Sequence, residues 1–122
     1  MTRPVDIAEK FSLFDEPWSP KIVGQVNDMH VKLARLAGEF TWHAHAEEDE
    51  MFFVMEGVLI MKFRDRDERI GPGQFIIVPR GTEHLPVTET PEVKVVLFEP
   101  ASTVNTGDQP DSERTVRELD IL

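Results

Sequence analysis

Residues 38–57 read GEFTWHAHAEEDEMFFVMEG and residues 73–84 read GQFIIVPRGTEH, and these two stretches decide how the chain folds. The first places two histidines one residue apart, then a run of acidic residues, then the apolar run Met51 to Met55. The second places a third histidine shortly after a Pro-x-Gly turn. Short apolar runs bounded by glycine and proline are typical of β-strands. We therefore expect both stretches to lie in β-structure.

The same pattern extends on both sides of these stretches. Runs rich in Val, Ile, Phe and Met alternate with turn residues, and no helical period interrupts them, which argues against alternating strands and helices. Closely spaced short strands indicate an all-β sandwich or barrel. We expect strands at 22–26, 29–37, 40–45, 50–56, 58–64, 74–78, 84–88 and 93–99.

The two ends of the chain differ from this central part. Residues 4–14 predict a short helix, because Ile7, Phe11 and Phe14 fall on one face. The polar tail is expected to wrap the barrel and to end in a short helix, since Thr115-x-x-Glu118 matches a capping box. We expect a single domain over residues 1–122, with an N-terminal arm at 1–21, a barrel at about 22–99 and a C-terminal tail at 100–122.

The composition excludes several classes of function. The 122 residues carry 13 Lys+Arg against 23 Asp+Glu, a formal net charge of −10, which argues against nucleic acid and anionic membrane surfaces as partners. Cysteine is absent, which removes disulfides, thiolate metal sites and thiol nucleophiles. Tyrosine is absent too, so no phenol can donate a proton. The run Met51 to Met55 is too short to span a bilayer, and no signal-like segment opens the chain, so we expect a cytoplasmic protein.

Three of the four histidines, with one carboxylate, predict a metal site. His43 and His45 leave the same face of an expected strand, because side chains alternate along a strand. Glu50 opens the next strand and His84 opens a later one, so antiparallel pairing can bring all four together inside a barrel. Three neutral imidazoles and one carboxylate suit a divalent first-row metal (Mn, Fe, Co, Ni, Cu or Zn). They leave coordination positions of an octahedral ion open for a substrate.

Alternatives exist for each of these residues. His43 and His45 could be exposed on an edge strand, and His84 could be a hydrogen-bonded core histidine. Asp49 competes with Glu50 as the carboxylate ligand, and we select Glu50 because it has the parity of an inward strand position. His30, the fourth histidine, matches no motif and is expected at the surface or satisfied within a strand.

The spacing of these residues resembles the two signature motifs of the cupin superfamily. The first stretch reads Gly38-x4-His43-x-His45-x4-Glu50-x6-Gly57, and the second reads Gly73-x5-Pro79-x-Gly81-x2-His84. The chain departs from the family pattern in having one residue fewer between Gly38 and His43, and in having Thr88 where Asn is usual. The resemblance implies a jelly-roll β-barrel in which two antiparallel sheets enclose a metal and a substrate pocket. It also implies that the metal ligands are His43, His45, Glu50 and His84.

The tail carries a second, narrower resemblance. The sequence Glu99-Pro100…Asn105-Thr106-Gly107-Asp108 is similar to that of small one-domain cupins often labelled mannose-6-phosphate isomerase-like. That label describes similarity and does not establish an activity. A sugar-phosphate isomerase would need a basic phosphate clamp, and the available cations are not compelling by spacing. They are Arg35, Lys62, Arg64 and Arg80.

Strand parity also predicts an apolar outer face. If Glu50 points inward, then Phe52 and Val54 line the interior, and the alternate residues point outward: Met51, Phe53 and Met55. Trp42 is expected to join this outer face. The N-terminal segment could cover it with Phe11, Phe14 and Trp18, and a second subunit could do so as well. We expect a homodimer, because closed two-fold dimers are the commonest oligomers.

The site permits three functions. The first is a metal-dependent enzyme, of the isomerase, dioxygenase or lyase type, acting on a small polar or aromatic molecule through the Lewis acidity of the ion. The second is a non-catalytic module that binds or senses a small-molecule ligand. The third, a structural cupin with a vestigial site, is disfavoured by the intact ligand set. A proton donor in the pocket would favour the enzyme, and the nearby acidic candidates are Glu56 and Glu83.

Overall fold

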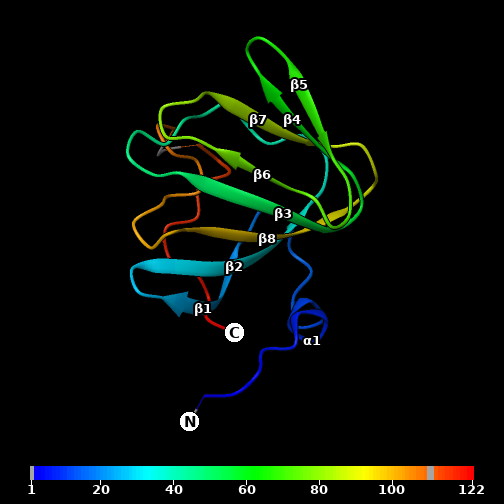
Figure 1. The fold of residues 1–122 in the computed structure, drawn as a ribbon, viewed down its shortest axis with the longest axis vertical. Helices are drawn as coiled ribbons and strands as arrows, with labels where there is room; N and C mark the ends of the chain where they lie inside the picture. Colours follow the sequence, from blue (N-terminus) through cyan, green and yellow to red (C-terminus); the bar gives the residue numbers. More distant parts are fainter. Residues whose placement is uncertain (1, 110–111) are drawn as a thin grey trace.

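The structure is a computed structural model that describes residues 2–109 and 112–122. The described residues form one short helix and eight strands (Figure 1). In chain order these are α1 (Ile7–Phe11), β1 (Lys21–Val26), β2 (Met29–Leu36), β3 (Glu50–Glu56), β4 (Leu59–Phe63), β5 (Asp67–Ile70), β6 (Phe75–Val78), β7 (His84–Thr88) and β8 (Val93–Pro100).

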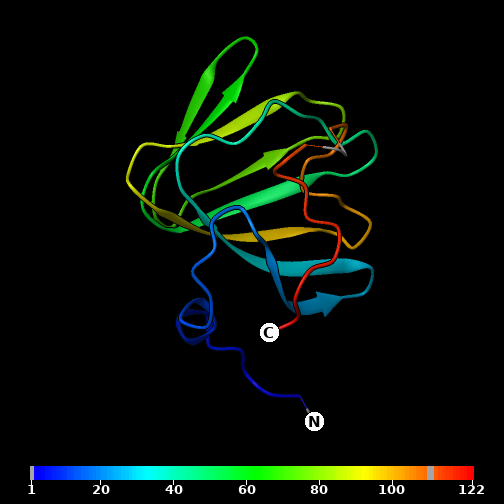
Figure 2. The ribbon, with the colours of Figure 1, turned by 180° about the vertical axis from the view of Figure 1, so that it is seen from behind.

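The strands form two antiparallel sheets. One has five strands in the order β1-β2-β8-β3-β6, and the other has three in the order β5-β4-β7. Strands far apart in sequence are neighbours in the larger sheet, where β8 lies between β2 and β3. In Figure 2 the tail, in orange and red, returns across the molecule to end beside β1, where Leu122 N donates to Ile22 O. This arrangement confirms the expected all-β jelly roll.

Side chains alternate along β3 as parity predicts. Glu50, Phe52 and Val54 are buried, whereas Met51 and Phe53 are half-buried on the opposite face. The inward residues of both sheets pack into one apolar core. Its buried members are Trp18, Ala34, Leu36, Phe52, Val54, Leu59, Met61, Phe63, Ile70, Val78, Val93, Val95 and Leu97.

The expected strand at 40–45 is wrong. These residues lie between β2 and β3 without forming a ladder. The segment joins β7 through two isolated bridges, Glu39 with Val87 and His43 with His84, and through Phe40 N, which donates to Pro86 O. Conversely, the strand β5 was not expected, because its sequence DERI is mostly charged. It forms a hairpin with β4 at the edge of the smaller sheet, where exposed positions accept charged residues.

The helices are also shorter than expected. The helix predicted at 4–14 covers only Ile7–Phe11. Its N-cap is Asp6, whose side chain accepts a hydrogen bond from Glu9 N. Residues 112–122 contain no helix. The Thr115 hydroxyl contacts Thr106 Oγ1 at 2.6 Å and Gln109 O at 3.2 Å, so it does not cap a helix toward Glu118.

The N-terminal arm covers part of the outer face of the larger sheet. Phe11 and Phe14 pack against Leu33 of β2, but Trp18 turns inward instead and joins the main core. The expectation that Trp18 covers the outer face is therefore wrong. Trp42 does not join that face either, because its ring lies 3.8 Å from the guanidinium carbon of Arg64, which follows β4 of the smaller sheet. Among the described residues, no helix is long and apolar enough to cross a membrane.

Candidate metal centre

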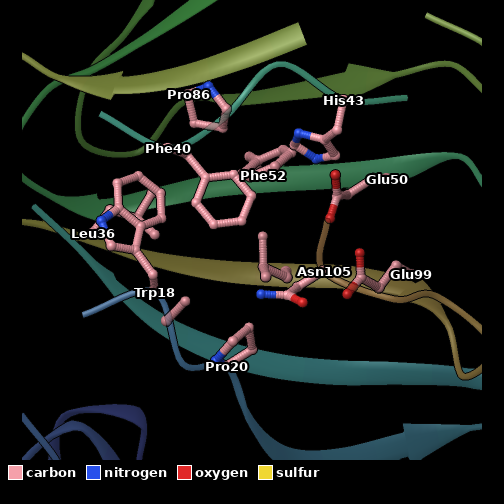
Figure 3. Close-up of a pocket in the computed structure, with 12 residues that line it drawn as sticks. Trp18, Pro20, Leu36, Phe40, His43, Glu50, Phe52, Pro86, Glu99 and Asn105 are labelled. Atoms are coloured by element: carbon pink, nitrogen blue, oxygen red, sulfur yellow. The ribbon is translucent and has the colours of Figure 1, made fainter. Parts of the chain in front are cut away.

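The structure brings together the four residues selected from the sequence. His43 and His45 come from the segment between β2 and β3, Glu50 opens β3, and His84 opens β7. All four are buried, and each offers a ligand atom within 4.8 Å of the others. Figure 3 shows the His43 ring and the Glu50 carboxyl on the same side of a cavity. His30 lies outside this cluster, half-buried on β2.

Backbone hydrogen bonds to β7 hold one side of the segment that carries the two histidines. His43 N donates to His84 O at 3.1 Å, and His84 N donates to His43 O at 2.9 Å. Gly81 N then donates to His45 O at 2.7 Å. These contacts replace the missing strand ladder and place His43 and His45 beside His84.

The C-terminal tail holds the other side of this segment. Asp108 N donates to Ala44 O at 2.9 Å, and Ala44 N donates to Asp108 Oδ1 at 2.9 Å. Gly107 allows this approach, because it has a φ of +52° and a Cβ there would lie 2.3 Å from Ala44 O. With the backbone of Ala44 turned toward the tail, the side chains of His43 and His45 both face the interior.

Hydrogen bonds orient two of the imidazoles. Nδ1 of His43 lies 2.8 Å from Thr41 O, and Nδ1 of His84 lies 2.9 Å from Thr82 O. A carbonyl can only accept, so each Nδ1 carries the proton and each Nε2 keeps its lone pair. Metal-ligating histidines commonly show this arrangement.

The atoms that face the centre of the cluster have no hydrogen-bond partner. Among the described residues, the buried atoms without one include His45 Nε2, His84 Nε2 and Glu50 Oε1. Glu50 Oε1 lies 3.3 Å from His45 Nε2 and 3.5 Å from His84 Nε2. Buried polar atoms are normally satisfied. One divalent cation among these atoms would satisfy all three, so the donor set fits a metal ion.

The two histidines of the segment have opposite pKa shifts. Burial lowers the pKa of His43 to about 4, and the neighbouring His84 adds to this effect. Burial also acts against the charged form of His45, but the adjacent Glu50 carboxylate outweighs it and raises the His45 pKa. Without a metal, His45 therefore holds a proton more readily than His43.

A second buried carboxyl group, that of Glu99, touches the cluster. Burial acts to raise the Glu50 pKa, but the adjacent Glu99 carboxyl group and the two neighbouring histidine rings bring it well below its usual value. Burial and the adjacent Glu50 raise the pKa of Glu99 well above its usual value, against the pull of Lys32. Lys32 Nζ lies 2.8 Å from Glu99 Oε1, and both side chains are 2% exposed.

The sequence did not select Glu99 as the acid in the pocket. The two candidates it suggested are exposed, since Glu56 pairs with Lys94 and Glu83 pairs with Arg64. Parity was the signal that could have found Glu99, because alternate residues of β8 are buried: Val93, Val95, Leu97 and Glu99. The carboxylate alternative Asp49 is exposed and accepts a hydrogen bond from Arg80 N at 2.9 Å.

A cavity opens beside His43, Glu50 and Glu99. It measures about 400 Å³ of empty space when counted out to its open mouth, with open solvent included. Its lining is mostly apolar and comes from β2, β3, β7, β8 and the connecting segments (Figure 3). The lining residues are Trp18, Pro20, Ala34, Leu36, Phe40, His43, Glu50, Phe52, Pro86, Leu97, Glu99 and Asn105.

Comparison with known proteins identifies similar chains. A family model described as a cupin domain matches residues 29–99. A crystal structure of a cupin-2 domain protein from Shewanella frigidimarina is 42% identical, with a TM-score of 0.77 over 79% of this chain and 93% of that one. The protein YdbB of Bacillus subtilis is 34% identical over 72% of this chain and 80% of its own length. An acireductone dioxygenase of Rhodopseudomonas palustris is 36% identical over 52% of this chain, which spans 42% of that enzyme.

Proposed function

The chain belongs to the cupin domain family, and we propose that His43, His45, Glu50 and His84 bind one divalent first-row transition metal ion. The observation that supports this proposal is the convergence of buried imidazole nitrogens and a carboxylate oxygen that have no hydrogen-bond partner among the described residues. When bound, such an ion supplies Lewis acidity toward the oxygen atoms of a small molecule. Its identity among Mn, Fe, Co, Ni, Cu and Zn is left open by these ligand types.

We propose that the protein acts on a small molecule held in the cavity beside this site. The apolar walls exclude water from the ligand, while Glu50 and Glu99 place two carboxyl groups at one end. A metal-dependent isomerase, dioxygenase or lyase would use this combination. The partial similarity to an acireductone dioxygenase supports dioxygen chemistry within that group.

The second candidate is a non-catalytic module that binds or senses a small molecule. The small size and apolar lining of the cavity would serve binding equally well. A panel of small hydroxy and keto compounds, assayed for turnover on metal-loaded protein, separates the two candidates. Turnover of any member supports the enzyme, and binding without turnover supports the module.

Metal analysis tests the site itself. Wild-type protein should hold about one ion per chain, and His45→Ala and His84→Ala should lose it. His30→Ala is the matched control, because it removes a histidine that lies outside the cluster. Elemental analysis after dialysis measures the metal, and circular dichroism checks that each variant folds. Equal metal content in wild type, His45→Ala and His84→Ala would show that these residues are not the ligands.

We also propose a homodimer formed through the outer face of β3 and β6. Phe75 lies opposite Phe53 and Ile77 lies opposite Met51, which makes a continuous apolar patch. Phe75 is 56% exposed and Ile77 is 55% exposed, and neither belongs to the cluster that Phe11 and Phe14 form on this face with Leu33. A patch of this kind on an edge strand favours association. A second copy is the occupant we propose, since the same patch can pair with itself around a two-fold axis.

Light scattering on purified protein tests this dimer. Wild type should have the mass of two chains, and Phe75→Asp should have the mass of one. Val26→Asp is the control, because Val26 is 53% exposed on the opposite edge strand β1. A monomeric wild type at high concentration would overturn the proposal. The cytoplasmic location expected from the sequence stays a prediction.

A further inference from the structure

The cavity beside the metal cluster has an apolar end and a polar end. At the apolar end the rings of Trp18 and Phe40 stack with centroids 4.7 Å apart and an interplanar angle of 25°. At the polar end lie Glu50 and Glu99, with His43 beside them (Figure 3). A molecule that fills this space must therefore have an apolar body, and its oxygen atoms must lie together at one end.

No lysine or arginine lines the cavity within the described part of the chain. Three of the four cations considered from the sequence are paired elsewhere: Arg35 with Glu92, Arg64 with Glu83 and Arg80 with Asp49. The fourth, Lys62, alternates with the buried residues of β4 and is not among the lining residues. Lys32 forms an ion pair with Glu99. A phosphate group would thus meet two carboxyl groups and no counter-charge from the protein.

The polar lining offers few atoms for ligand recognition. The Asn105 amide is held in place, because Nδ2 donates to Arg114 O at 2.8 Å and Oδ1 accepts from Val116 N at 2.9 Å. Trp18 Nε1 donates to Ala37 O at 2.9 Å. Glu99 Oε1 accepts from Lys32, but Glu99 Oε2 has no hydrogen-bond partner among the described residues. Apart from the proposed metal ligands, Glu99 is therefore the buried lining residue whose side chain still has an atom without a hydrogen-bond partner, so it is the group we assign to a polar ligand atom.

Building on the proposed function, we infer that the site takes a small uncharged molecule with an apolar body and two neighbouring oxygens. One oxygen faces the metal ligands, and the other is a hydroxyl that hydrogen-bonds to Glu99. The oxygens must be neighbours because Glu50 and Glu99 lie at the same end of the cavity (Figure 3). Phosphorylated compounds are excluded, which separates this protein from a sugar-phosphate isomerase.

Three probes that share one ring test this inference on zinc-loaded protein. Catechol has two neighbouring hydroxyls, phenol has one, and phenyl phosphate is an anion. The Trp42→Phe variant leaves Trp18 as the only tryptophan of the chain, so its fluorescence reports occupancy of the cavity. Zinc is chosen because it has no redox chemistry with catechol. Catechol should bind about tenfold more tightly than phenol, because its second hydroxyl adds one hydrogen bond to Glu99, and phenyl phosphate should bind most weakly.

A double variant tests the role of Glu99. Lys32→Met with Glu99→Leu removes both buried charges together, which spares the fold an unpaired ion. It should lower catechol affinity about tenfold, to the level of phenol, and leave phenol affinity unchanged. The matched control is Lys94→Met with Glu56→Leu, which removes a carboxylate–lysine pair on the outer face of the same sheet.

The outcomes separate this inference from the proposed function. Failure of the wild-type protein to hold zinc would count against the metal site. Full zinc content with phenyl phosphate bound as tightly as catechol would overturn the inference alone, and this comparison needs no variant at Glu99. Unchanged catechol affinity in the folded, zinc-loaded double variant would overturn the role of Glu99.

Discussion

The four residues of the candidate metal centre are held in two different ways. Glu50 and His84 each open a regular strand, so ladders that run along β3 and β7 position them. His43 and His45 lie on a segment outside any ladder, held by β7 on one side and by the tail around Asp108 on the other. The first pair depends on strand pairing alone, whereas the second pair also depends on residues more than sixty positions later.

Because of this difference, the site is most easily disturbed at the segment that carries His43 and His45. A strand ligand shares its ladder with many hydrogen bonds, so the loss of one is compensated by the others. At Ala44 the tail holds the segment through two hydrogen bonds, one from Asp108 N to Ala44 O and one from Ala44 N to Asp108 Oδ1. We therefore expect changes in the tail to weaken metal binding while leaving the two sheets intact.

The largest effect is expected from Gly107→Ala. The new Cβ would lie 2.3 Å from Ala44 O and 2.9 Å from Ala44 C, at a left-handed φ, so the tail must move away from the segment. We expect a loss of about 3 kcal/mol in the free energy of unfolding, together with loss of bound metal. Urea unfolding and elemental analysis measure the two effects.

Gly73→Ala is the control for backbone strain. Gly73 also has a left-handed φ, of +81°, but nothing lies within 4 Å of its Cβ position. This variant should lose about 1 kcal/mol and keep its metal. If both variants lose the same stability and the same metal, the contact between the tail and Ala44 has no special role.

A smaller effect is expected from Asp108→Ala, which removes the acceptor for Ala44 N. Metal affinity should fall about tenfold, as is usual when a group that supports a metal ligand is removed. Asp108→Asn should retain most of the affinity, because its side-chain oxygen can still accept the hydrogen bond. Competition with a chelator measures the affinities. Equal losses in the two variants would show that the negative charge matters and the hydrogen bond does not.

The smallest effect is expected from pH on the metal-free protein. The His43 pKa is lowered to about 4 in the folded state, so its contribution to stability is present above the unfolded pKa and lost as pH falls toward 4. The His45 pKa is raised, so its contribution is present below the unfolded pKa and lost as pH rises. The contributions of His43 and His45 change with pH in opposite directions. The free energy of unfolding of metal-free protein should therefore change little between about pH 7.5 and 5.

Metal-loaded protein should respond more strongly over the same range, because protons compete with the ion for three imidazoles. The gap in Tm between loaded and EDTA-treated protein should therefore narrow as the pH falls. Thermal melts at several pH values measure this gap. A gap that stays constant down to about pH 5 would argue against histidine ligation.

Strand periodicity made much of the fold and of the candidate site predictable. Alternation along residues 50–56 placed Glu50, Phe52 and Val54 inward, as the structure has them. The spacing of His43, His45 and His84 within glycine- and proline-bounded motifs selected the residues that the structure brings together. These features are local, because the burial of a strand residue is encoded in its neighbours one and two positions away.

Only the tertiary structure decided the contacts between distant segments. The segment at 40–45 has the composition of a strand, but β7 and the tail take the place of its ladder. Trp18 turns inward to stack on Phe40, and Glu99 lies against Glu50 although they are far apart in the chain. The local sequence pattern predicts that a residue is buried. Which residue it contacts depends on the order and register of the strands, and these are set by many pairings between distant segments.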